Sequence, residues 1–450
     1  MADPTAATGN RIVIMGAAGR DFHNFNMLYR IDATARVVAF TAAQIPGIAG
    51  RRYPPELAGP AYPDGIPIAD EADLEAVCRA HDATTVMFAY SDVTYADVLH
   101  AASRAAAAGC DFVLAGPART MLTAAKPVIA VCAVRTGCGK SQTTRYLARR
   151  LVELGLRPAV LRHPMPYGDL AAQAIQRFAA PADLDAADCT IEEREEYEPY
   201  LELGLPVFAG VDYGAILAAA ETEADIILWD GGNNDLPFVR PDLHIVLADA
   251  LRPGHETAYW PGESNLRMAD IVILAKADIA DAAALATVRR NAVAANPSAT
   301  IVAGASPVRL DDPDAVRGRR VLVVDDGPTL THGGMPYGAG YVAAMAAGAG
   351  EILDPRGFAT PAIAALYASY PHLGPVLPAM GYSAGQRRDL AATIAASGAD
   401  TVVAGTPIDL ARVLDLAVPV VRARYDYADA GEPALWPLVE SFLHDRGLGA

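Results

Sequence analysis

Short runs rich in β-branched residues alternate with Ala- and Leu-rich stretches along the whole chain, and this alternation constrains the fold more than any other feature. Continuous apolar runs suit strands buried on both faces, and the intervening helices supply crossovers between parallel strands. Thirteen such runs occur, namely RIVIMG, ARVVAF, TTVMFAY, DFVLAG, PVIAVCAV, RPAVLRH, ADIILWD, DLHIVLAD, DIVILAKAD, ATIVAGA, RVLVVDD, TVVAGT and PVVRARY. Because this number is too large for one ordinary sheet, the pattern predicts an α/β protein with several mainly parallel sheets.

The chain has 450 residues, of which 52% are hydrophobic, so it can form about three domains with large cores. The segment PARTMLTAAKP separates a first group of strands from the group that opens with PVIAVCAV. A second break is expected near NPSAT or in SPVRLDDPDAVRGRR, before RVLVVDD. We therefore expect a Rossmann-like α/β domain at 1–126, a central domain at 127–318 and a C-terminal α/β domain at 319–450.

Charge and cysteine content restrict the partners and the compartment. The formal net charge is −17 and the pI is about 4.9, which disfavours binding to nucleic acid or to an anionic membrane. The five cysteines show no CxxC spacing, as is typical of a reducing cytoplasm without disulfides or thiolate zinc sites. No signal peptide or apolar run of about 18 residues is evident, so we predict a cytoplasmic protein.

The stretch VCAVRTGCGKSQTTRYL, residues 131–147, contains one of only three lysines in the chain. It combines a strand, a glycine-bearing turn and a helix, and Ala133 to Ser141 fits the Walker A pattern with Ala in the first glycine position. Backbone N–H groups of such a turn surround phosphate oxygens, and a compact ammonium suits this cradle better than a planar guanidinium. The predicted nucleotide-binding residues are Thr136, Gly137, Cys138, Gly139, Lys140, Ser141 and Gln142. The motif predicts a P-loop NTPase core, with Lys140 on the β/γ oxygens.

A P-loop also needs a metal-organising carboxylate at the end of a neighbouring strand. Asp230 ends the run ADIILWD and precedes two glycines. We predict that Asp230 and Ser141 hold Mg²⁺ and that Lys140 and Asp230 are catalytic. Asp235 is a second candidate, and a capping role for Asp230 is the structural alternative.

The run IVILAKAD resembles the (N/T)KxD element that reads guanine in GTPases. Lys276 would lie along the base and Asp278 would accept hydrogen bonds from it. Ala275 replaces the usual Asn or Thr, so ATP is at least as well supported as GTP, and a surface Lys–Asp pair is the alternative.

Four loops that follow strands carry Arg or His beside Gly or Pro. Ligands of open α/β sheets bind outside the carboxyl ends of the strands, and guanidinium forks suit compact phosphates or carboxylates. The candidates for binding a small anionic substrate are Arg20, His23, Arg162, His163, Arg252, His255, Thr331 and His332. Taken singly, each could instead be a surface residue or a helix cap.

Two further segments are less specific. The turn GAAGRD lacks the third glycine of a dinucleotide fingerprint, and no acidic residue follows ARVVAF, which disfavours NAD binding. The N-terminal domain is then expected to bind substrate or form dimer contacts. The acidic run IEEREEYEPYLELG, residues 191–204, predicts a solvated helix, with gating or partner binding as the alternative.

Taken together, IMGAAGRDFHNFN, AVRTGCGKSQTTR, RHPMPYGDL, WDGGNNDLPF, RPGHE and DDGPTLTHGGMPYGAG resemble the cyclic 2,3-diphosphoglycerate synthetases and related bacterial proteins often labelled predicted GTPases. The resemblance covers nearly the whole chain. It implies Mg²⁺-dependent transfer of a phosphoryl group from ATP to 2,3-diphosphoglycerate to form an intramolecular phosphoanhydride, with Arg135 as a further catalytic residue at the nucleotide. Our hypothesis for the order is that transfer comes first, and that the second phosphate then closes the ring and expels inorganic phosphate. It also implies a homodimer.

A different class, a regulatory GTPase or metallochaperone-like P-loop switch, is the alternative. Metallochaperones carry a His-rich or Cys-based metal site, whereas the nine histidines of this chain are scattered. This favours an ATP-dependent ligase acting on a small polyanion, and the incomplete N-terminal fingerprint disfavours a nicotinamide-dependent oxidoreductase.

Overall fold

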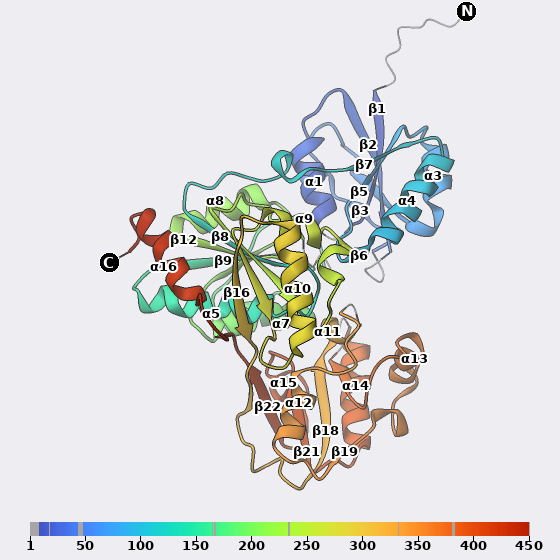
Figure 1. The fold of residues 1–450 in the computed structure, drawn as a ribbon. Helices are drawn as coiled ribbons and strands as arrows, with labels where there is room; N and C mark the ends of the chain where they lie inside the picture. Colours follow the sequence, from blue (N-terminus) through green and yellow to red (C-terminus); the bar gives the residue numbers. More distant parts are fainter. Residues whose placement is uncertain are drawn as a thin grey trace, which may run out of the picture.

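The structure is a computed structural model, and it describes residues 9–449 apart from 18, 44–47, 164, 166–167, 233–234, 332 and 380–382. All thirteen apolar runs form strands. They are distributed over three separate sheets in which most neighbouring strands are parallel. Figure 1 shows three α/β units, with the central one lying between the other two. The predicted α/β class with parallel sheets is therefore confirmed.

The N-terminal unit is a sheet with the strand order β3-β4-β2-β1-β5-β7 and helices on both faces. Its strands are β1 (Asn10–Met15), β2 (Ala35–Ala42), β3 (Arg52–Tyr53), β4 (Ile66–Asp70), β5 (Thr85–Phe88) and β7 (Asp111–Leu114). Its helices are α1 (Arg20–Leu28), α2 (Pro55–Ala58), α3 (Leu74–Ala80) and α4 (Tyr95–Ala107). Ile12 and Ile14 pack on one face of the sheet and Val13 and Met15 on the other, because successive strand residues point to opposite faces. Both faces are buried, which explains the uninterrupted apolar run.

The central unit is a nine-stranded sheet with the order β10-β11-β9-β12-β8-β13-β15-β16-β23. Its strands are β8 (Val128–Ala133), β9 (Pro158–Arg162), β10 (Gln176–Phe178), β11 (Val207–Ala209), β12 (Ile226–Asp230), β13 (Leu243–Asp249), β15 (Ile271–Ala275), β16 (Thr300–Ala305) and β23 (Ala428–Asp429). Its helices are α5 (Lys140–Glu153), α6 (Pro181–Ala186), α7 (Ile191–Leu201), α8 (Tyr213–Glu223), α9 (Gly262–Met268), α10 (Ala282–Ala295) and α16 (Leu435–Asp445). Only the two outermost strands, β10 and β23, pair antiparallel. The seven strands between them are parallel, so their carboxyl ends lie along one edge.

The C-terminal unit is a smaller sheet with the order β17-β22-β21-β18-β19, and β20 also pairs with β18. Its strands are β17 (Val308–Leu310), β18 (Arg320–Asp326), β19 (Glu351–Ile352), β20 (Leu377–Ala379), β21 (Thr401–Gly405) and β22 (Val420–Tyr425). Its helices are α11 (Gly327–Thr331), α12 (Ala339–Ala346), α13 (Pro361–Ser369), α14 (Ala384–Ala396) and α15 (Leu410–Val413). A two-stranded ribbon of β6 (Val93–Thr94) and β14 (Tyr259–Trp260) joins the N-terminal unit to the central unit.

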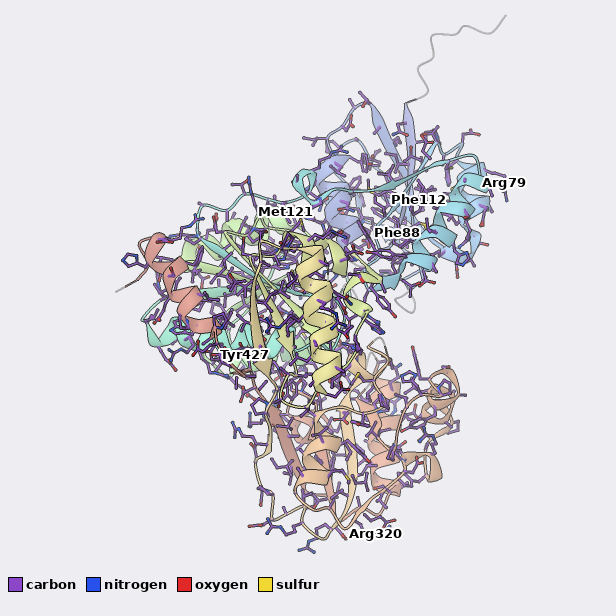
Figure 2. The ribbon with its side chains drawn as sticks, viewed as in Figure 1. Arg79, Phe88, Phe112, Met121, Arg320 and Tyr427 are labelled. Carbon is purple, nitrogen blue, oxygen red and sulfur yellow. The ribbon has the colours of Figure 1, made fainter. Side chains whose placement is uncertain are left out.

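Sheet membership differs from the sequence-based division at 318/319 in two places. β17 precedes that boundary but pairs with β22 of the C-terminal sheet. β23 and α16 follow it but return to the central unit, where Tyr427, Trp436 and Leu443 belong to the central core, and Figure 2 shows Tyr427 there. A linear boundary cannot represent a chain that leaves the central sheet after β16 and comes back to its edge.

The acidic run is not a solvated helix, and that expectation was wrong. α7 lies between two cores, because Ile191 packs in the C-terminal core and Tyr197 and Tyr200 pack in the central one. Buried carboxylates of this helix have partners: Glu198 pairs with Arg194 and Arg412. A buried charge is tolerated when it is paired. Arg194 belongs to α7 itself, whereas Arg412 comes from a distant part of the chain.

The described helices are short. The longest are α5 and α10, with 14 residues each, whereas a helix needs about 20 residues to cross a bilayer. Within the described part of the chain, no helix combines the length and the apolar composition that crossing a membrane would require.

Candidate functional site

The predicted phosphate loop is a tight turn between β8 and α5. Gly137 and Gly139 adopt positive φ angles of 79° and 100°, which L side chains rarely tolerate. A Cβ atom on Gly139 would lie 2.7 Å from Nε2 of Gln142, and one on Gly137 would lie 3.5 Å from Cγ2 of Thr329. No side chain caps the N-terminus of α5, so its first N–H groups and the positive end of the helix dipole face the loop. This geometry suits an anion.

Asp230 is the centre of a buried charge cluster beside the loop. It is fully buried and lies opposite Arg162 in the register of β12 and β9. Lys140 donates from Nζ to Oδ1 at 2.8 Å, Tyr200 donates from its hydroxyl to Oδ2 at 2.6 Å, and Arg162 pairs with the same carboxylate. Arg162 also pairs with Glu196 of α7 and lies 3.4 Å from Oγ of Ser141.

The charges in this cluster shift one another's protonation. Burial alone would raise the pKa of Asp230, but the positive charges of Arg162 and Lys140 outweigh it and hold that pKa well below its usual value. Burial lowers the pKa of Lys140, and Asp230 partly opposes this shift. The carboxylate is therefore ionised at neutral pH and available to an ammonium, a guanidinium or a metal ion.

Asp235 forms a second cluster with Arg20, the first residue of α1, and His163, which follows β9. Arg20 donates from Nε to its Oδ1 at 3.1 Å, and Nδ1 of His163 lies 3.1 Å from its Oδ2. Asp235 is 2% exposed, and although burial raises its pKa, Arg20 and His163 hold it below the usual value. Arg20 stacks on the ring of Phe238 at 4.2 Å. A cation and an anion from different units thus lie side by side, close to the end of β12.

His23 does not join that polar group. It is 1% exposed, its ring stacks on Phe238 with centroids 4.1 Å apart, and Nε2 lies 2.6 Å from the carbonyl oxygen of Thr120. Burial lowers its pKa to about 3, so the ring is neutral at physiological pH. The structure therefore places His23 as a packing residue between the N-terminal and central units, which differs from the expected substrate-binding role.

On the other side of the loop, Arg135 is held by residues of the N-terminal and central units. It donates from Nε to Oδ1 of Asp92 at 2.6 Å, lies 3.0 Å from Nδ1 of His255 and stacks on Tyr259 at 3.7 Å. Arg135 is 6% exposed. Its contacts join the phosphate loop to the N-terminal unit.

Asp249, at the end of β13, supports the phosphate loop through Arg252. It accepts hydrogen bonds from Lys276 at 2.8 Å and from Arg252 at 2.9 Å. Arg252 also donates to the carbonyl oxygen of Thr136 at 2.8 Å and lies 3.5 Å from Sγ of Cys138. Burial would raise the pKa of Asp249, but Lys276 and Arg252 hold it below its usual value. Arg252 and Lys276, both predicted to contact ligands, thus support the phosphate loop: Arg252 bonds to it directly, and Lys276 bonds to Asp249.

The remaining predicted residues lie near α5 and in the C-terminal unit. Asp278 accepts from the backbone N–H of Ser306 at 3.2 Å, and Gln142 donates to the Ser306 hydroxyl at 2.6 Å. The Thr331 hydroxyl donates to the carbonyl oxygen of Gly327 at 2.9 Å within α11. His332 lies outside the described residues. Gly333, which lies shortly after α11, is nevertheless close to the phosphate loop, because its carbonyl oxygen accepts a hydrogen bond from Arg252 at 2.9 Å.

Sequence reasoning missed Asp249, Asp92, Tyr200 and Glu196. Asp249 carried a usable signal, since it ends a buried strand as Asp230 does. Tyr200 and Glu196 lie in the run that was expected to be solvated. Asp92 has a positive φ of 59° in a loop of another unit, and the sequence gives no pattern that connects it with Arg135.

Gly262, which lies outside the phosphate loop, also constrains the backbone that leads into this loop. A Cβ atom on Gly262, the first residue of α9, would overlap the carbonyl oxygen of Val134, the first residue after β8. We expect Gly262→Ala to destabilise the central unit by about 1–3 kcal/mol and to weaken nucleotide binding, because backbone must move. Gly116→Ala is the matched control, since a Cβ there meets nothing within 4 Å. Thermal unfolding and nucleotide titration of both variants check this, and equal melting temperatures would contradict it.

Strand, glycine turn, uncapped helix and strand-end carboxylate define the P-loop class of nucleotide-binding domains. No protein-family model matches the chain. Arginine synthetase ArcE of Thermococcus kodakarensis is 56% identical over 432 residues, which cover 96% of each chain. The chain belongs to the family of this protein. The name differs from that of the cyclic 2,3-diphosphoglycerate synthetases, so the predicted membership of that family is not confirmed.

Solved structures are more remote. LpxK from Aquifex aeolicus in complex with ATP is 13% identical and covers 72% of this chain and 90% of its own, with a TM-score of 0.44. A ParA family ATPase from Chlorobium tepidum is 15% identical over 42% of this chain and 86% of its own, with a TM-score of 0.24. Similarity at this level carries no argument about function.

Proposed function

We propose that the chain is an ATP-dependent synthetase that forms arginine. The observation that carries the proposal is the 56% identity, across 96% of both chains, to a protein named arginine synthetase. The P-loop with its Lys140–Asp230 pair supports the nucleotide requirement. A synthetase of this kind couples formation of a C–N bond to breakdown of a nucleoside triphosphate.

In this proposal the nucleotide is ATP, with its phosphates in the turn formed by residues 136–142. Lys140 moves from Asp230 to the β/γ oxygens, and this movement frees an oxygen of the carboxylate. The Ser141 hydroxyl and the Asp230 carboxylate are hard oxygen ligands that suit Mg²⁺, and Arg162 lies beside both of them. Bound Mg²⁺ would neutralise phosphate charge. Arg135 would contribute positive charge if its contact with Asp92 opened.

The chemistry of the product suggests the reaction. A guanidino group differs from a ureido group by one nitrogen in place of oxygen. Transfer of the γ-phosphoryl group to the ureido oxygen would make that oxygen a leaving group. Attack by ammonia on the carbon would then form the C–N bond, and phosphate would depart with the oxygen. The protein contributes mainly positioning and charge stabilisation.

The cluster around Asp235 is the proposed position of the amino acid. Arg20 presents a guanidinium and Asp235 a carboxylate, which complement the carboxylate and ammonium groups of an α-amino acid. His163 follows Arg162 directly, so this cluster lies next to the Asp230 cluster. Arg252 and His255, predicted earlier to contact substrate, are assigned to supporting the loop and Arg135.

The test is nucleotide turnover by the purified protein with defined acceptors. We expect release of ADP and phosphate, and formation of arginine, only when ATP, Mg²⁺, L-citrulline and ammonium are all present, with ATP preferred over GTP. Citrulline is the ureido counterpart of arginine. Arginine with ADP and phosphate should yield ATP in the reverse direction.

Two other outcomes would contradict the proposal. Turnover that depends on 2,3-diphosphoglycerate and not on citrulline would support the phosphoanhydride synthesis that the motif resemblance implies. Slow GTP hydrolysis without any acceptor would support a switch. The predicted homodimer can be measured on the same sample by light scattering.

A further inference from the structure

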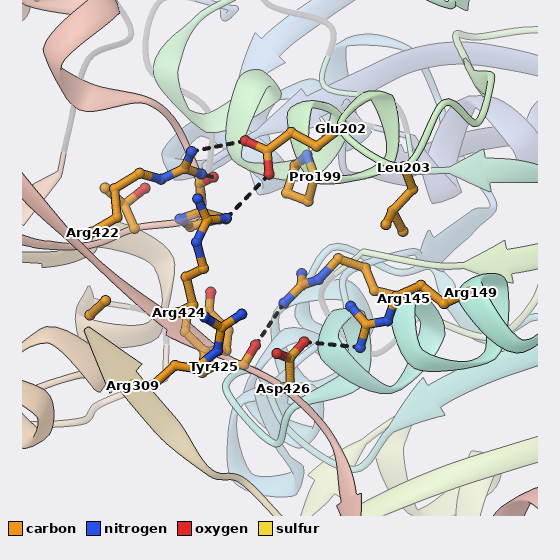
Figure 3. A pocket seen from close by; sticks show the side chains of 13 residues that line it. Arg145, Arg149, Pro199, Glu202, Leu203, Arg309, Arg422, Arg424, Tyr425 and Asp426 are labelled. Atoms are coloured by element: carbon orange, nitrogen blue, oxygen red, sulfur yellow. Dashed lines mark hydrogen bonds and ion pairs between the residues drawn. The ribbon is translucent and has the colours of Figure 1, made fainter. Parts of the chain in front are cut away.

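A cavity of about 190 Å³ lies between the central and C-terminal units, away from the phosphate loop. Its lining residues come from α5, from the end of α7 and the residues after it, from β17, from β22 with Asp426, and from the loop after β21 (Figure 3). Arg145 and Arg149 are five and nine residues beyond Lys140 on α5, which corresponds to about 7 and 13 Å along a helix. No residue of the phosphate loop lines the cavity. It is far larger than the roughly 10–15 Å³ that one water molecule needs.

Positive charge dominates the lining, in a protein whose net charge is −17. Five of the lining side chains are arginines and two are carboxylates. In Figure 3 the arginines of β17 and β22 lie on one side of the cavity and those of α5 on the other. The arginines are Arg145, Arg149, Arg309, Arg422 and Arg424.

Some of these guanidinium groups are neutralised within the protein. Arg422 and Arg424 share the carboxylate of Glu202, at 2.9 and 3.4 Å, and Arg149 donates to Oδ1 of Asp426 at 3.0 Å. Arg424 also pairs with Asp311, outside the lining. Glu202 and Asp311 together balance the charges of Arg422 and Arg424, and Asp426 balances that of Arg149.

Arg145 and Arg309 have no carboxylate partner in the described part of the chain, and of the two only Arg145 is buried, since Arg309 is exposed. Arg145 is only 9% exposed, and its Nη2 donates at 3.3 Å to the carbonyl oxygen of Tyr425. A buried guanidinium without a counter-ion is costly. The Tyr425 ring, 5.5 Å from the guanidinium, offsets part of this cost, and a bound anion would supply the missing charge.

We propose that this cavity binds a compact polyanion, a small molecule with two or more phosphate or carboxylate groups. The guanidinium fork binds both groups in a bidentate manner, and opposite walls of arginines suit a ligand with anionic groups at both ends. The ligand would join α5 and α7, which carry Lys140 and Tyr200 of the Asp230 cluster, to β22 of the C-terminal unit. The inference is independent of the proposed function, because it rests on residues outside the phosphate loop.

The experiment is calorimetric titration of the full-length protein with pyrophosphate and, separately, with citrate. We expect one binding event that persists when the phosphate loop is saturated with a non-hydrolysable ATP analogue. Arg145→Met and Arg309→Met should each weaken it by about 10- to 100-fold, since each removes a charged hydrogen-bond donor. Arg289→Met, an exposed arginine on α10, is the matched control and should leave it unchanged. The stronger of the two probes identifies phosphate or carboxylate as the preferred group.

Thermal unfolding separates ligand binding from a structural role. Without an anion, Arg145→Met should leave the melting temperature unchanged or raise it, because an uncompensated buried charge is removed. Pyrophosphate or citrate should stabilise the wild type but not this variant. The proposal is overturned if neither anion binds, if the analogue abolishes binding, if both variants bind like the wild type, or if sodium chloride at equal ionic strength has the same effect.

Discussion

Replacing Lys140 with alanine is expected to lower ATP turnover by at least about 10²–10³-fold, the effect of removing one preorganised charge from a transition-state site. Lys140 is the first residue of α5 and its ammonium is poised beside the phosphate loop, 2.8 Å from Asp230. The fold should survive, because Arg162 and Tyr200 continue to satisfy the carboxylate. Steady-state ADP release with saturating substrates measures the effect.

The chain offers a matched control for this variant. Lys126 is another of its three lysines and lies before β8, away from the loop. Lys126→Ala should keep full turnover. Full turnover in Lys140→Ala would contradict the assignment of residues 136–142 as a phosphate loop. A large fall in the melting temperature of Lys140→Ala would show that Lys140 is mainly structural.

Replacing Asp230 with asparagine should have the largest combined effect on activity and stability. It keeps the volume but leaves Lys140 and Arg162 without the carboxylate between them, and breaking a buried pair costs about 3–5 kcal/mol. We expect a melting temperature roughly 10 °C lower and loss of turnover. Asp445→Asn, at an exposed position, should change stability by no more than about 0.5 kcal/mol.

The pH dependence of the stability lost in Asp230→Asn follows from the lowered pKa of Asp230 in the folded protein. A carboxylate whose pKa is lower in the folded state than in the unfolded state stabilises the fold above the unfolded pKa, about 4. That contribution is lost as the pH falls through the folded-state pKa. The stability difference between wild type and Asp230→Asn should therefore be full at pH 7 and shrink below about pH 4. Chemical denaturation at a series of pH values checks it, and a constant difference would contradict the ion-pair explanation.

Much of the fold could be predicted from local pattern. The thirteen apolar runs are strands because burial on both faces requires apolar residues at every position, and this requirement is visible within each run. Boundaries between units were less accessible. β17 and β23 are three and two residues long, and their sheet is decided by pairing with strands more than 100 residues away.

Some features of the candidate site could likewise be predicted from local sequence, and others could not. The glycine turn and the strand-end Asp230 follow local rules, because the turn needs positive φ angles and the strand end fixes where the carboxylate lies. The buried position of α7 could not be predicted, since six charged residues within eleven, including Glu196 and Glu198, indicate solvent exposure. Its arginine partners, Arg412 and Arg162, come from outside the helix.

The sequence by itself determined where the thirteen apolar strands lie and where the backbone can surround a phosphate, because these properties depend on residues close together in the chain. Only the tertiary structure decided which charges meet. Arg162 reaches Asp230 through the pairing of β9 with β12, and five arginines from three segments surround one cavity. Electrostatic energy depends on distance in space and on burial, and neither quantity can be obtained from separation along the sequence.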